Sequence, residues 1–508
     1  MAYDRLIYGK DNLERIVGLE VTEDKAEIFV QDPDGSVRVE FHPNYYWILS
    51  DKPLSREWGL LKGNLHYRFF KRFNKREEFA RARSMFKSKN PFSIWNEKEA
   101  LMVKDGLTYY KGMRHDEVTV LSFDIETSGL VKDDSSRIFL ISNTLRKNGV
   151  TTRKLFAFDE YESEGAMLEA WSAWVKETDP SLMVGHNVMT YDLPYIQHVA
   201  DKNGVRLDLG RDGSPMRFED YISRYRKDAT QFIEYNKVRI YGREVVDTFF
   251  LSLKHDIGRK YESYGLKYIV KKEGLEVEGR QHYDASQIRY KYDDPVEWEK
   301  IKRYAMHDAD DSLALYDLMI PPYFYMAQAV PKPFQLMMES ATGSMVNSIM
   351  LRSYLQEGYG VPKGDENGEF QGALSGGYPG VYTNCLKWDV ASLYPSVMLH
   401  YKIGPGKKDP RDNFLKMLEY FTRERLKNKK LAKETGDSYF KNLQESQKVM
   451  VNSAYGFMGA PGLNFNNPQG AAEVTRRGRE ILEKAVMWAT GSELKHGEEA
   501  EEEEDDGS

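Results

Sequence analysis

The sequence predicts an α/β multidomain protein with a helical hairpin in its later part. Three observations support this fold class. The chain has 508 residues, which is too long for a single hydrophobic core and corresponds to several domains of ordinary size. Residues 116–325 alternate strand-like and helix-like segments, a pattern typical of an α/β domain. Residues 411–455 combine two long helical patterns with a short polar turn.

The composition excludes several classes of protein. A single cysteine, Cys385, excludes an internal disulfide framework and a cysteine-based zinc site. No run of about 18 apolar residues is present, so we expect no transmembrane helix and no membrane partner. The N-terminal residues lack the features of a signal peptide, so we expect a cytoplasmic location. The net charge of −7 comes from an acidic tail at 498–506, and it does not argue against nucleic-acid binding.

Residues 1–115 begin with three strand-like runs, at 16–21, 25–30 and 37–41. A basic and aromatic stretch follows at 67–87. Its mixture of Lys, Arg, Phe and Tyr suits phosphate contact combined with base stacking. An amphipathic helix with solvated cations would have the same composition, so both interpretations stay open.

Residues 118–125 form a predicted strand in the middle segment, and a second strand is predicted at 137–143. Side chains alternate between the two faces of a strand, so Asp124 and Glu126 share one face. Two carboxylates at that separation repel each other unless a cation lies between them. A strand-borne Asp-x-Glu is weak support for a metal site when it stands alone.

Two further segments add acidic residues to this pattern. Asp192 ends the stretch Asn-Val-Met-Thr-Tyr-Asp, which follows an apolar strand-like run. Tyr304 and Asp308 lie four residues apart on a helix predicted at 295–319, which places them on one face. Together with the strand pair, these carboxylates could hold two divalent cations, and the tyrosine could orient an attacking water. The alternative is a set of unrelated surface acids.

Another candidate site begins with a carboxylate that follows a predicted strand at 381–388. The chain reaches Asp389 after a glycine-rich turn at 372–380 and this strand, and then continues through Leu393 and Tyr394. A carboxylate at a strand end can hold a metal ion while the following backbone amides face phosphates. The ring of Tyr394 would lie against the sugar of a nucleotide and exclude a 2′-hydroxyl. The same residues could instead cap a helix that begins with a proline.

The helical hairpin is predicted from helices at 411–433 and 439–455. Arg425 and Lys448 should stand at matching distances from the turn, about 17 Å at a rise of about 1.5 Å per residue. Lys429 lies one helical turn from Arg425, and Asn452 and Tyr455 share a helix face with Lys448. Together these side chains form one polar group: Arg425, Lys429, Lys448, Asn452 and Tyr455. The three cations could converge on one triphosphate. The alternative is a solvated cationic helix pair.

The ordered acidic segments resemble the three exonuclease motifs of proofreading DNA polymerases, which read Asp-x-Glu, Asn-x-x-x-Tyr-Asp and Tyr-x-x-x-Asp. The residues that carry this resemblance are Asp124, Glu126, Asp192, Tyr304 and Asp308. Each motif is common by itself, but the ordered set is specific.

The later segments are similar to motifs of B-family DNA polymerases. Asp389 with the following Ser-Leu-Tyr-Pro-Ser looks like motif A, and Lys448-x-x-x-Asn-Ser-x-Tyr-Gly looks like motif B. The resemblance extends over residues 1 to about 490 in the order of the family. It implies a mixed N-terminal domain, a ribonuclease-H-like 3′→5′ exonuclease, a partial palm of α+β type and helical-hairpin fingers. The expected bounds are 1–115 (N-terminal domain), 116–325 (exonuclease), 326–410 (palm), 411–458 (fingers), 459–490 (continuing palm) and 491–508 (acidic disordered tail).

The resemblance also implies roles for the candidate residues. In the exonuclease, Tyr304 would be catalytic beside four metal ligands: Asp124, Glu126, Asp192 and Asp308. In the polymerase site Asp389 would be the catalytic metal ligand. The residues that would bind the nucleotide are Leu393, Tyr394, Arg425, Lys429, Lys448, Asn452 and Tyr455. Tyr394 would be the sugar gate, the residue that excludes a 2′-hydroxyl. The implied cofactor is Mg²⁺, two ions per site, with Mn²⁺ as a substitute, and the implied substrates are deoxynucleoside triphosphates and primer–template DNA.

The third polymerase motif of the family, a Tyr-x-Asp-Thr-Asp turn, has no counterpart in the sequence. Residues 475–482 resemble the helix that leads to it, and the acidic tail follows. We therefore expect the large part of a split polymerase, completed by a small subunit that carries this motif and a thumb. The alternatives are a stand-alone 3′→5′ exonuclease and a non-catalytic DNA-binding scaffold. A sliding clamp is a further candidate partner, and the tail would be solvated or dock to a basic partner.

Overall fold

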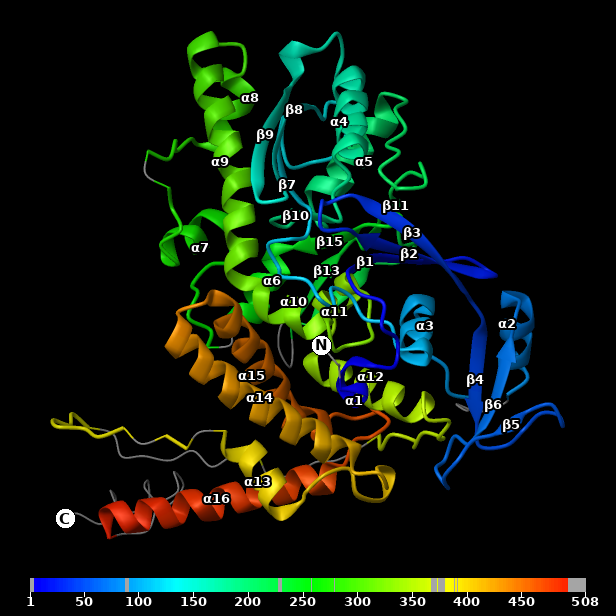
Figure 1. The fold of residues 1–508 in the computed structure, drawn as a ribbon. Helices are drawn as coiled ribbons and strands as arrows, with labels where there is room; N and C mark the ends of the chain where they lie inside the picture. Colours follow the sequence, from blue (N-terminus) through cyan, green and yellow to red (C-terminus); the bar gives the residue numbers. More distant parts are fainter. Residues whose placement is uncertain are drawn as a thin grey trace, which may run out of the picture.

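The computed structural model of the chain describes residues 4–86, 91–226, 231–256, 258–277, 279–366, 372, 380–387, 389–390 and 392–491. Figure 1 shows the sheet of the middle segment at the top, the N-terminal strands beside it, and the helices α14 and α15 below it. The long helix α16 lies along the bottom. Within the described residues, no helix is long and apolar enough to cross a membrane.

The N-terminal segment forms two antiparallel sheets of three strands each. The first contains the three predicted strands, namely β1 (Ile16–Val21), β2 (Lys25–Gln31) and β3 (Val37–Pro43). The second has the order β4 (Tyr46–Ser50), β6 (Phe69–Phe73) and β5 (Gly59–Leu60). The described part of the basic and aromatic stretch at 67–87 thus lies mainly on β6 and on α2 (Arg76–Ser84).

The middle segment is built on a five-stranded sheet with the order β15-β10-β7-β8-β9. The central strand β7 is parallel to β10, which is parallel to β15. On its other side, β8 pairs antiparallel with β7, and β9 pairs antiparallel with β8. The strands are β7 (Val120–Thr127), β8 (Ile138–Lys147), β9 (Val150–Ala157), β10 (Leu182–Gly185) and β15 (Glu244–Asp247). Strands and helices alternate as the sequence predicts.

Each face of this sheet is covered by helices, and β7 lies between them (Figure 1). Leu121, Phe123 and Ile125 share a core with α4 (Glu164–Thr178) and α5 (Asp192–Lys202). The alternate side chains of β7 face α9 (Pro295–Met319), where the Ser122 hydroxyl donates to the Ala309 carbonyl. The two-residue period of the strand therefore directs Asp124 and Glu126 to the α9 face.

The remaining elements are short connections and the helices of the later part. The short strands are β11 (Arg217–Phe218), β12 (Ser223–Arg226), β13 (Phe232–Tyr235) and β14 (Val238–Arg239). The shorter helices are α1 (Arg5–Tyr8), α3 (Glu97–Asp105), α6 (Thr248–His255), α7 (Leu266–Lys272), α8 (Ile288–Lys291), α10 (Pro321–Ala327) and α11 (Phe334–Glu339), with single 3₁₀ turns η1 (Phe158–Glu160), η2 (Ala285–Gln287) and η3 (Gly406–Lys408). The later helices are α12 (Thr342–Leu355), α13 (Leu393–Tyr401), α14 (Asn413–Thr435), α15 (Ser438–Gly459) and α16 (Pro468–Thr490).

The predicted helical hairpin is confirmed as α14 and α15. Gly436 ends α14 with φ +68°, a left-handed conformation that favours glycine, and the Asp437 carboxylate caps α15 by accepting from the Tyr439 amide. The Asn428 side-chain amide donates to the Gln447 side chain at 3.1 Å between the two helices. This buried contact fixes the register of the hairpin.

The strand predicted at 381–388 is wrong for the residues that the structure describes there. Residues 381–387 have no strand partner, and the Val381 and Leu386 side chains are 99% and 86% exposed. A strand needs a neighbour to accept its backbone hydrogen bonds. The described part of 326–410 contains helices and two isolated bridges, but no strand that could pair, so its expected α+β character is not seen. Most of the glycine-rich turn and tail residues 492–508 lie outside the described residues.

A buried carboxylate joins the N-terminal segment, the central sheet and α11. Glu244 on β15 accepts a hydrogen bond from the Tyr109 hydroxyl at 2.6 Å and from the Gln335 backbone amide at 2.7 Å. Burial raises the pKa of this carboxyl group. These donors compensate for the loss of water around it.

We expect Tyr109→Phe to lower the free energy of unfolding by about 1–3 kcal/mol, because Glu244 loses a donor at a buried site. Tyr110→Phe is the matched control, since the neighbouring Tyr110 hydroxyl is buried without a hydrogen-bond partner among the described residues. Urea unfolding followed by circular dichroism measures both. Equal losses in the two variants would contradict this role of Glu244.

Candidate active site

Three of the predicted acidic residues meet on the α9 face of the central sheet. Asp124 and Glu126 project from β7, and Asp308 projects from α9, which packs against that strand. One carboxylate oxygen from each residue lies within 4.8 Å of the other two. Glu126 and Asp308 are buried and Asp124 is half-buried. The predicted convergence of strand and helix is therefore present in the structure.

The fourth predicted carboxylate, Asp192, lies next to this cluster of three and outside it. It is the first residue of α5, directly after the loop that follows β10, and it is buried. After burial, the charge of Asp247 at the end of β15 contributes most to the raised pKa of Asp192. Asp247 was not among the residues predicted from the sequence. The sequence signal that could have identified Asp247 is an acid directly after two valines, in Glu-Val-Val-Asp. In the sheet, Asp247 pairs with Gly185 at the end of the parallel strand β10.

The carboxyl groups of Asp124, Glu126 and Asp192 hold their protons more tightly than usual when no cation is bound. Burial, followed by the charges of Asp192 and Asp308, raises the pKa of Asp124 well above its usual range. Burial and then Asp308 raise the pKa of Glu126, and burial and then Asp247 raise that of Asp192. These shifts arise because like charges share a volume from which water is largely excluded.

Two cations that sequence reasoning missed partly offset this charge. The Arg280 guanidinium, whose side chain is 3% exposed, lies 2.7 Å from Asp308 Oδ1 and also pairs with Asp311. Lys267 Nζ lies 3.6 Å from Asp308 Oδ2 and donates to the Tyr304 hydroxyl. Both cations come from the segment between α6 and α9, and no local pattern in the sequence marks them as partners of the acids.

Tyr304 lies one helical turn before Asp308, as its spacing predicts, and it is buried. Burial, followed by the charges of Asp308 and Glu126, raises the pKa of its hydroxyl group. The phenol therefore stays protonated at any physiological pH. It can donate a hydrogen bond to a water or phosphate oxygen, and it cannot act as a base.

The donor set fits a hard divalent cation. All three clustered ligands are carboxylates, the chemistry that Mg²⁺ and Mn²⁺ prefer. The raised pKa values of Asp124 and Glu126 show that ionising these two groups is unfavourable without a positive charge near their oxygens. Of the three ligands, Asp308 forms the ion pairs with Lys267 and Arg280. The charge of Lys267 also lowers the pKa values of Asp124 and Glu126, but burial and the neighbouring acids outweigh it.

An open cleft of about 480 Å³ reaches Glu126 of this cluster. Its lining includes Glu126, the loop after β7, Tyr191 and the segment from η2 to α8. The Tyr191 hydroxyl is held by Thr127 at 2.6 Å and by the Gly129 carbonyl at 3.2 Å. The cleft thus joins an acidic end to an aromatic and aliphatic entrance.

The second predicted site lies around α13 and the helical hairpin. Ring centroids of Tyr394 on α13 and Tyr455 on α15 lie 4.6 Å apart. Arg425 Nη1 on α14 donates to the Ser392 hydroxyl at 2.8 Å, directly before α13. The structure thus brings three of the predicted nucleotide-binding side chains to the junction of three helices, next to half-buried Leu393.

The other members of this set are exposed. Lys429, Lys448 and Asn452 face solvent, and the nearest charge to Lys448 is Glu445, at 3.9 Å. Asp389 is also exposed, and it does not belong to any group of three metal-ligating side chains among the described residues. The structure therefore places the predicted phosphate-binding residues Lys429 and Lys448 on the surface, and within the described residues it places Asp389 in no group of three metal-ligating side chains.

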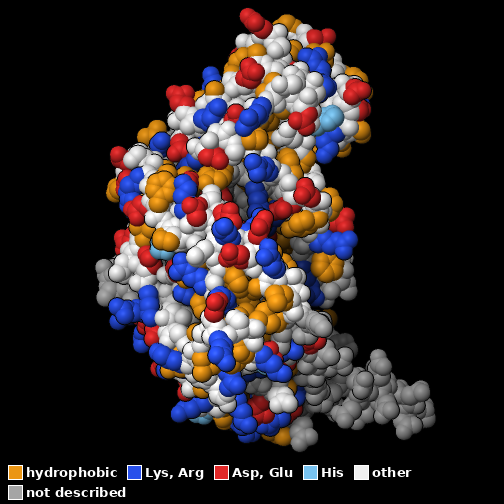
Figure 2. All heavy atoms as spheres, turned by 90° about the vertical axis from the view of Figure 1, so that its right-hand side faces the viewer, with side chains coloured by type: hydrophobic (Ala, Val, Ile, Leu, Met, Phe, Trp, Pro, Cys, Tyr) orange, Lys and Arg blue, Asp and Glu red, His pale blue; other side chains and the backbone are white. Residues whose placement is uncertain are grey.

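The basic and aromatic N-terminal stretch forms stacked cation–ring pairs. The Arg83 guanidinium lies 3.4 Å from the ring centroid of Trp95, and that of Arg72 lies 3.9 Å from the centroid of Tyr45. Figure 2 views the molecule from this side and shows Lys and Arg side chains interspersed with acidic and apolar ones. Nucleic-acid contact by this surface stays a prediction, because both interpretations accommodate such pairs.

Comparison with known proteins shows the family of this chain. Residues 81–269 match the family described as "DNA polymerase family B, exonuclease domain", and residues 406–505 match "DNA polymerase family B". The "DNA polymerase" of Pyrococcus glycovorans is 24% identical over 75% of this chain and 52% of its own length. "DNA polymerase 2" of Aeropyrum pernix is 27% identical over 76% and 50%. "DNA polymerase II" of Escherichia coli is 25% identical over 69% and 46%.

The chain spans about half the length of the curated relatives it matches. A solved structure of the family B DNA polymerase from Pyrobaculum calidifontis has the same fold, with a TM-score of 0.75 at 19% identity over 94% of this chain and 72% of that one. The matched segments contain the strand that carries Asp124 and Glu126, and the hairpin that carries Arg425 and Lys448. The chain belongs to the B family of DNA polymerases.

Proposed function

We propose that this chain is the exonuclease-bearing part of a DNA polymerase and removes nucleotides from the 3′ end of single-stranded DNA. One observation supports this proposal above the others: three carboxyl groups lie together, the pKa values of Asp124 and Glu126 are raised, and Glu126 lines an open cleft. A purely structural or scaffolding role gives no physical reason to maintain such a group.

The proposed mechanism assigns separate tasks to the side chains. Asp124, Glu126 and Asp308, with Asp192 beside them, would hold Mg²⁺ or Mn²⁺, two ions in the family scheme. Bound metal would supply an activated water and charge stabilisation for the leaving 3′ oxygen. The protonated Tyr304 hydroxyl would orient that water by donating or accepting a hydrogen bond. Arg280 would hold the Asp308 carboxylate in place.

We further propose that the α13–α15 region is the nucleotide-binding half of a polymerase site. Arg425, Lys429 and Lys448 would bind the triphosphate, and Asp389 would bind catalytic metal. Leu393, Tyr394, Asn452 and Tyr455 would line the nucleotide pocket, with Tyr394 against the sugar. DNA synthesis would then require further carboxylates and a thumb, which we propose a second polypeptide supplies. The exposed Val381, Leu386 and Trp488 side chains offer apolar surface for it.

The double variant Asp124→Ala/Glu126→Ala should lose digestion of a 5′-labelled single-stranded oligodeoxynucleotide in Mg²⁺, down to background, because it removes two of the three clustered ligands. Glu169→Ala, an exposed acid on α4, is the matched control and should keep wild-type activity. Product lengths on a denaturing gel measure the effect. Undiminished digestion by the double variant would place the hydrolytic site elsewhere.

Without divalent metal, the thermal midpoint of the exonuclease segment should fall as the pH rises from about 5 to about 8 and then level off. The folded-state pKa of Glu126 and of Asp192 is raised to about 8. Because this lies above the unfolded value, protonation stabilises the fold at low pH, and the contribution is lost as the pH rises through about 8. Mg²⁺ should restore the midpoint at high pH.

Differential scanning calorimetry in chelator and in Mg²⁺ measures this dependence. The isosteric variant Glu126→Gln is the control and should show a shallower decline, because it cannot ionise at that position. An identical decline in wild type and variant would contradict the assignment of the shift to this group.

Primer extension should require addition of the proposed second polypeptide, tested as a small protein that copurifies with this chain. In the completed polymerase, Lys448→Ala should raise the KM for deoxynucleotides about tenfold, because a phosphate contact is lost. Lys441→Ala, also exposed on α15, should leave it unchanged. The Asp124/Glu126 double variant should retain nucleotide addition. If no copurifying protein restores synthesis, the two-polypeptide proposal is wrong.

A further inference from the structure

His186 lies between the loop that leads to Asp192 and the segment that carries Lys267. It is the first residue after β10, and it is half-buried. Its Nε2 lies 2.8 Å from the Tyr264 carbonyl oxygen, three residues before Lys267. Its Nδ1 lies 3.0 Å from the hydroxyl of Thr248, the first residue of α6. One side chain therefore joins three segments that are far apart in the sequence.

The chemistry of these contacts fixes the state of the imidazole ring. A carbonyl oxygen can only accept a hydrogen bond, so Nε2 carries the proton and donates it to the Tyr264 carbonyl. Burial lowers the pKa of His186 to about 4, so the ring is neutral at physiological pH. The Phe249 ring packs against the imidazole edge to face, with 5.8 Å between the centroids. The side chain is therefore a donor held in one orientation.

The loop from which the imidazole projects is itself anchored by Asp247. The Asp247 carboxylate accepts from the Asn187 amide at 2.7 Å and from the Met189 amide at 3.1 Å. Both amides belong to the loop between β10 and α5, which starts with His186 and leads to Asp192, the first residue of α5. The histidine thus extends from backbone that is fixed to the end of β15.

The segment that the imidazole contacts is the start of α7. Ser263 and Gly265, on either side of Tyr264, are exposed, and the buried residues of α7 begin at Ile269. Packing against the core therefore holds the second half of this short helix. The hydrogen bond from His186 ties its exposed start to the loop at the end of the central sheet.

The position of this start determines what Lys267 can reach. The Lys267 ammonium donates to the Tyr304 hydroxyl and lies 3.6 Å from Asp308 Oδ2, although the side chain is 47% exposed. A long side chain loses rotamer freedom in such a contact, so a shift of its backbone readily weakens it. An ammonium group has donors only, so the Tyr304 oxygen accepts from it, and the phenol proton is left for Asp308 or for a water.

We propose that His186 is a positioning residue for the exonuclease reaction. Through the Tyr264 carbonyl it sets the place of Lys267, and Lys267 in turn sets the direction in which the Tyr304 hydroxyl donates. This inference rests on the proposed exonuclease function and names a residue outside the acidic cluster that governs its rate. The link ends on the group that would orient water, so its loss should lower kcat and leave the KM for DNA unchanged.

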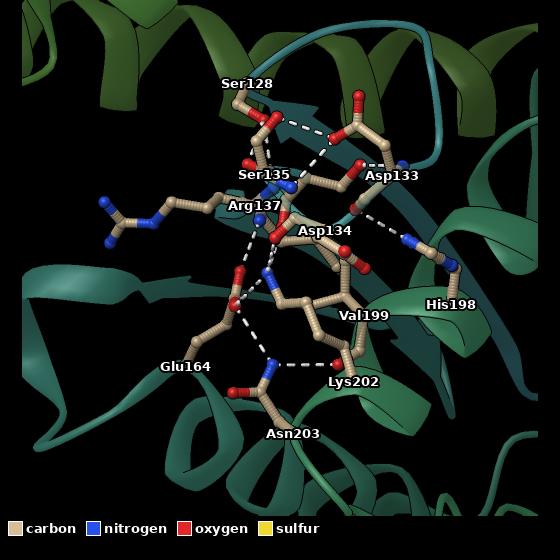
Figure 3. A network of polar contacts seen from close by, with 12 residues as sticks. Ser128, Asp133, Asp134, Ser135, Arg137, Glu164, His198, Val199, Lys202 and Asn203 are labelled. Atoms are coloured by element: carbon tan, nitrogen blue, oxygen red, sulfur yellow. Dashed lines mark hydrogen bonds and ion pairs between the residues drawn. The ribbon is translucent and has the colours of Figure 1, made fainter.

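His198 provides a matched control, because its Nε2 also contacts a backbone carbonyl, that of Asp133, at 2.9 Å. Figure 3 shows His198 reaching from α5 to the loop between β7 and β8. There the Asp133 carboxylate accepts from the Ser135 amide at 2.8 Å. The same kind of contact is thus made to a loop other than the segment that carries Lys267.

Digestion of a 5′-labelled single-stranded oligodeoxynucleotide by the full chain in Mg²⁺ gives kcat and KM for each variant. His186→Phe keeps a ring and removes the donor, so it should lower kcat about tenfold. His186→Gln can still donate to the carbonyl and should recover most of this loss. Lys267→Ala should also lower kcat, and adding His186→Phe to it should cause no further loss, because both changes remove the same contact. His198→Phe should keep the wild-type kcat.

Hydrogen–deuterium exchange of the metal-free chain tests the link without activity. Exchange at residues 264–267 should rise in His186→Phe and not in His186→Gln or His198→Phe. If the wild-type chain digests DNA but His186→Phe keeps its kcat, or its loss multiplies with that of Lys267→Ala, the positioning role is wrong and the proposed function stands. If exchange rises as expected but the wild-type chain does not digest DNA, the link from His186 to α7 is supported and the proposed function is wrong.

Discussion

The central physical constraint on the exonuclease segment is the mutual repulsion of carboxylates that the packing of the fold holds close together. Asp124 and Glu126 point to one face of β7 because side chains alternate along a strand, and α9 covers that face with Asp308. Hydrophobic packing on both faces of the sheet fixes these positions. Packing thus holds three carboxyl groups with one oxygen of each within 4.8 Å of the other two, and a bound cation would stabilise their ionised forms.

The surrounding structure limits how that charge can be neutralised. Arg280 and Lys267 reach Asp308, whereas the strand pair has no such partner in these contacts. Burial, followed by the charges of the neighbouring acids, keeps Tyr304 protonated, and the same two causes raise the pKa values of Asp124 and Glu126. One electrostatic constraint therefore accounts for both the demand for metal and the chemical state of the residue that would orient water.

Local patterns in the sequence predicted much of this geometry. The two-residue period of β7 gave the shared face of Asp124 and Glu126, and the helical spacing of Tyr304 and Asp308 holds within α9 (Pro295–Met319), the helix predicted at those same bounds. The hairpin of α14 and α15 followed from two helical periods and a turn. These features depend on residues close in sequence, where periodicity is informative.

The features that the sequence did not predict depend on contacts between distant segments. Lys267 on α7 and Arg280 in the loop that follows it act on Asp308 from a distant segment. Asp247 influences Asp192 because β15 and β10 are neighbours in the sheet. The strand predicted before Asp389 failed because strand formation needs a partner, which an alternating pattern in one segment cannot reveal. The charge and stacking of the N-terminal surface similarly depend on its three-dimensional neighbours.

The most direct test of the central claim is isothermal titration calorimetry of Mn²⁺ into the metal-free chain at pH 7, repeated in two buffers of different ionisation enthalpy. If buried carboxyl groups with raised pKa values form the cation site, binding will release protons into the buffer. Glu126→Gln will reduce both the affinity and the number of protons released. Binding with no proton release, or with the same release in the variant, would contradict the account.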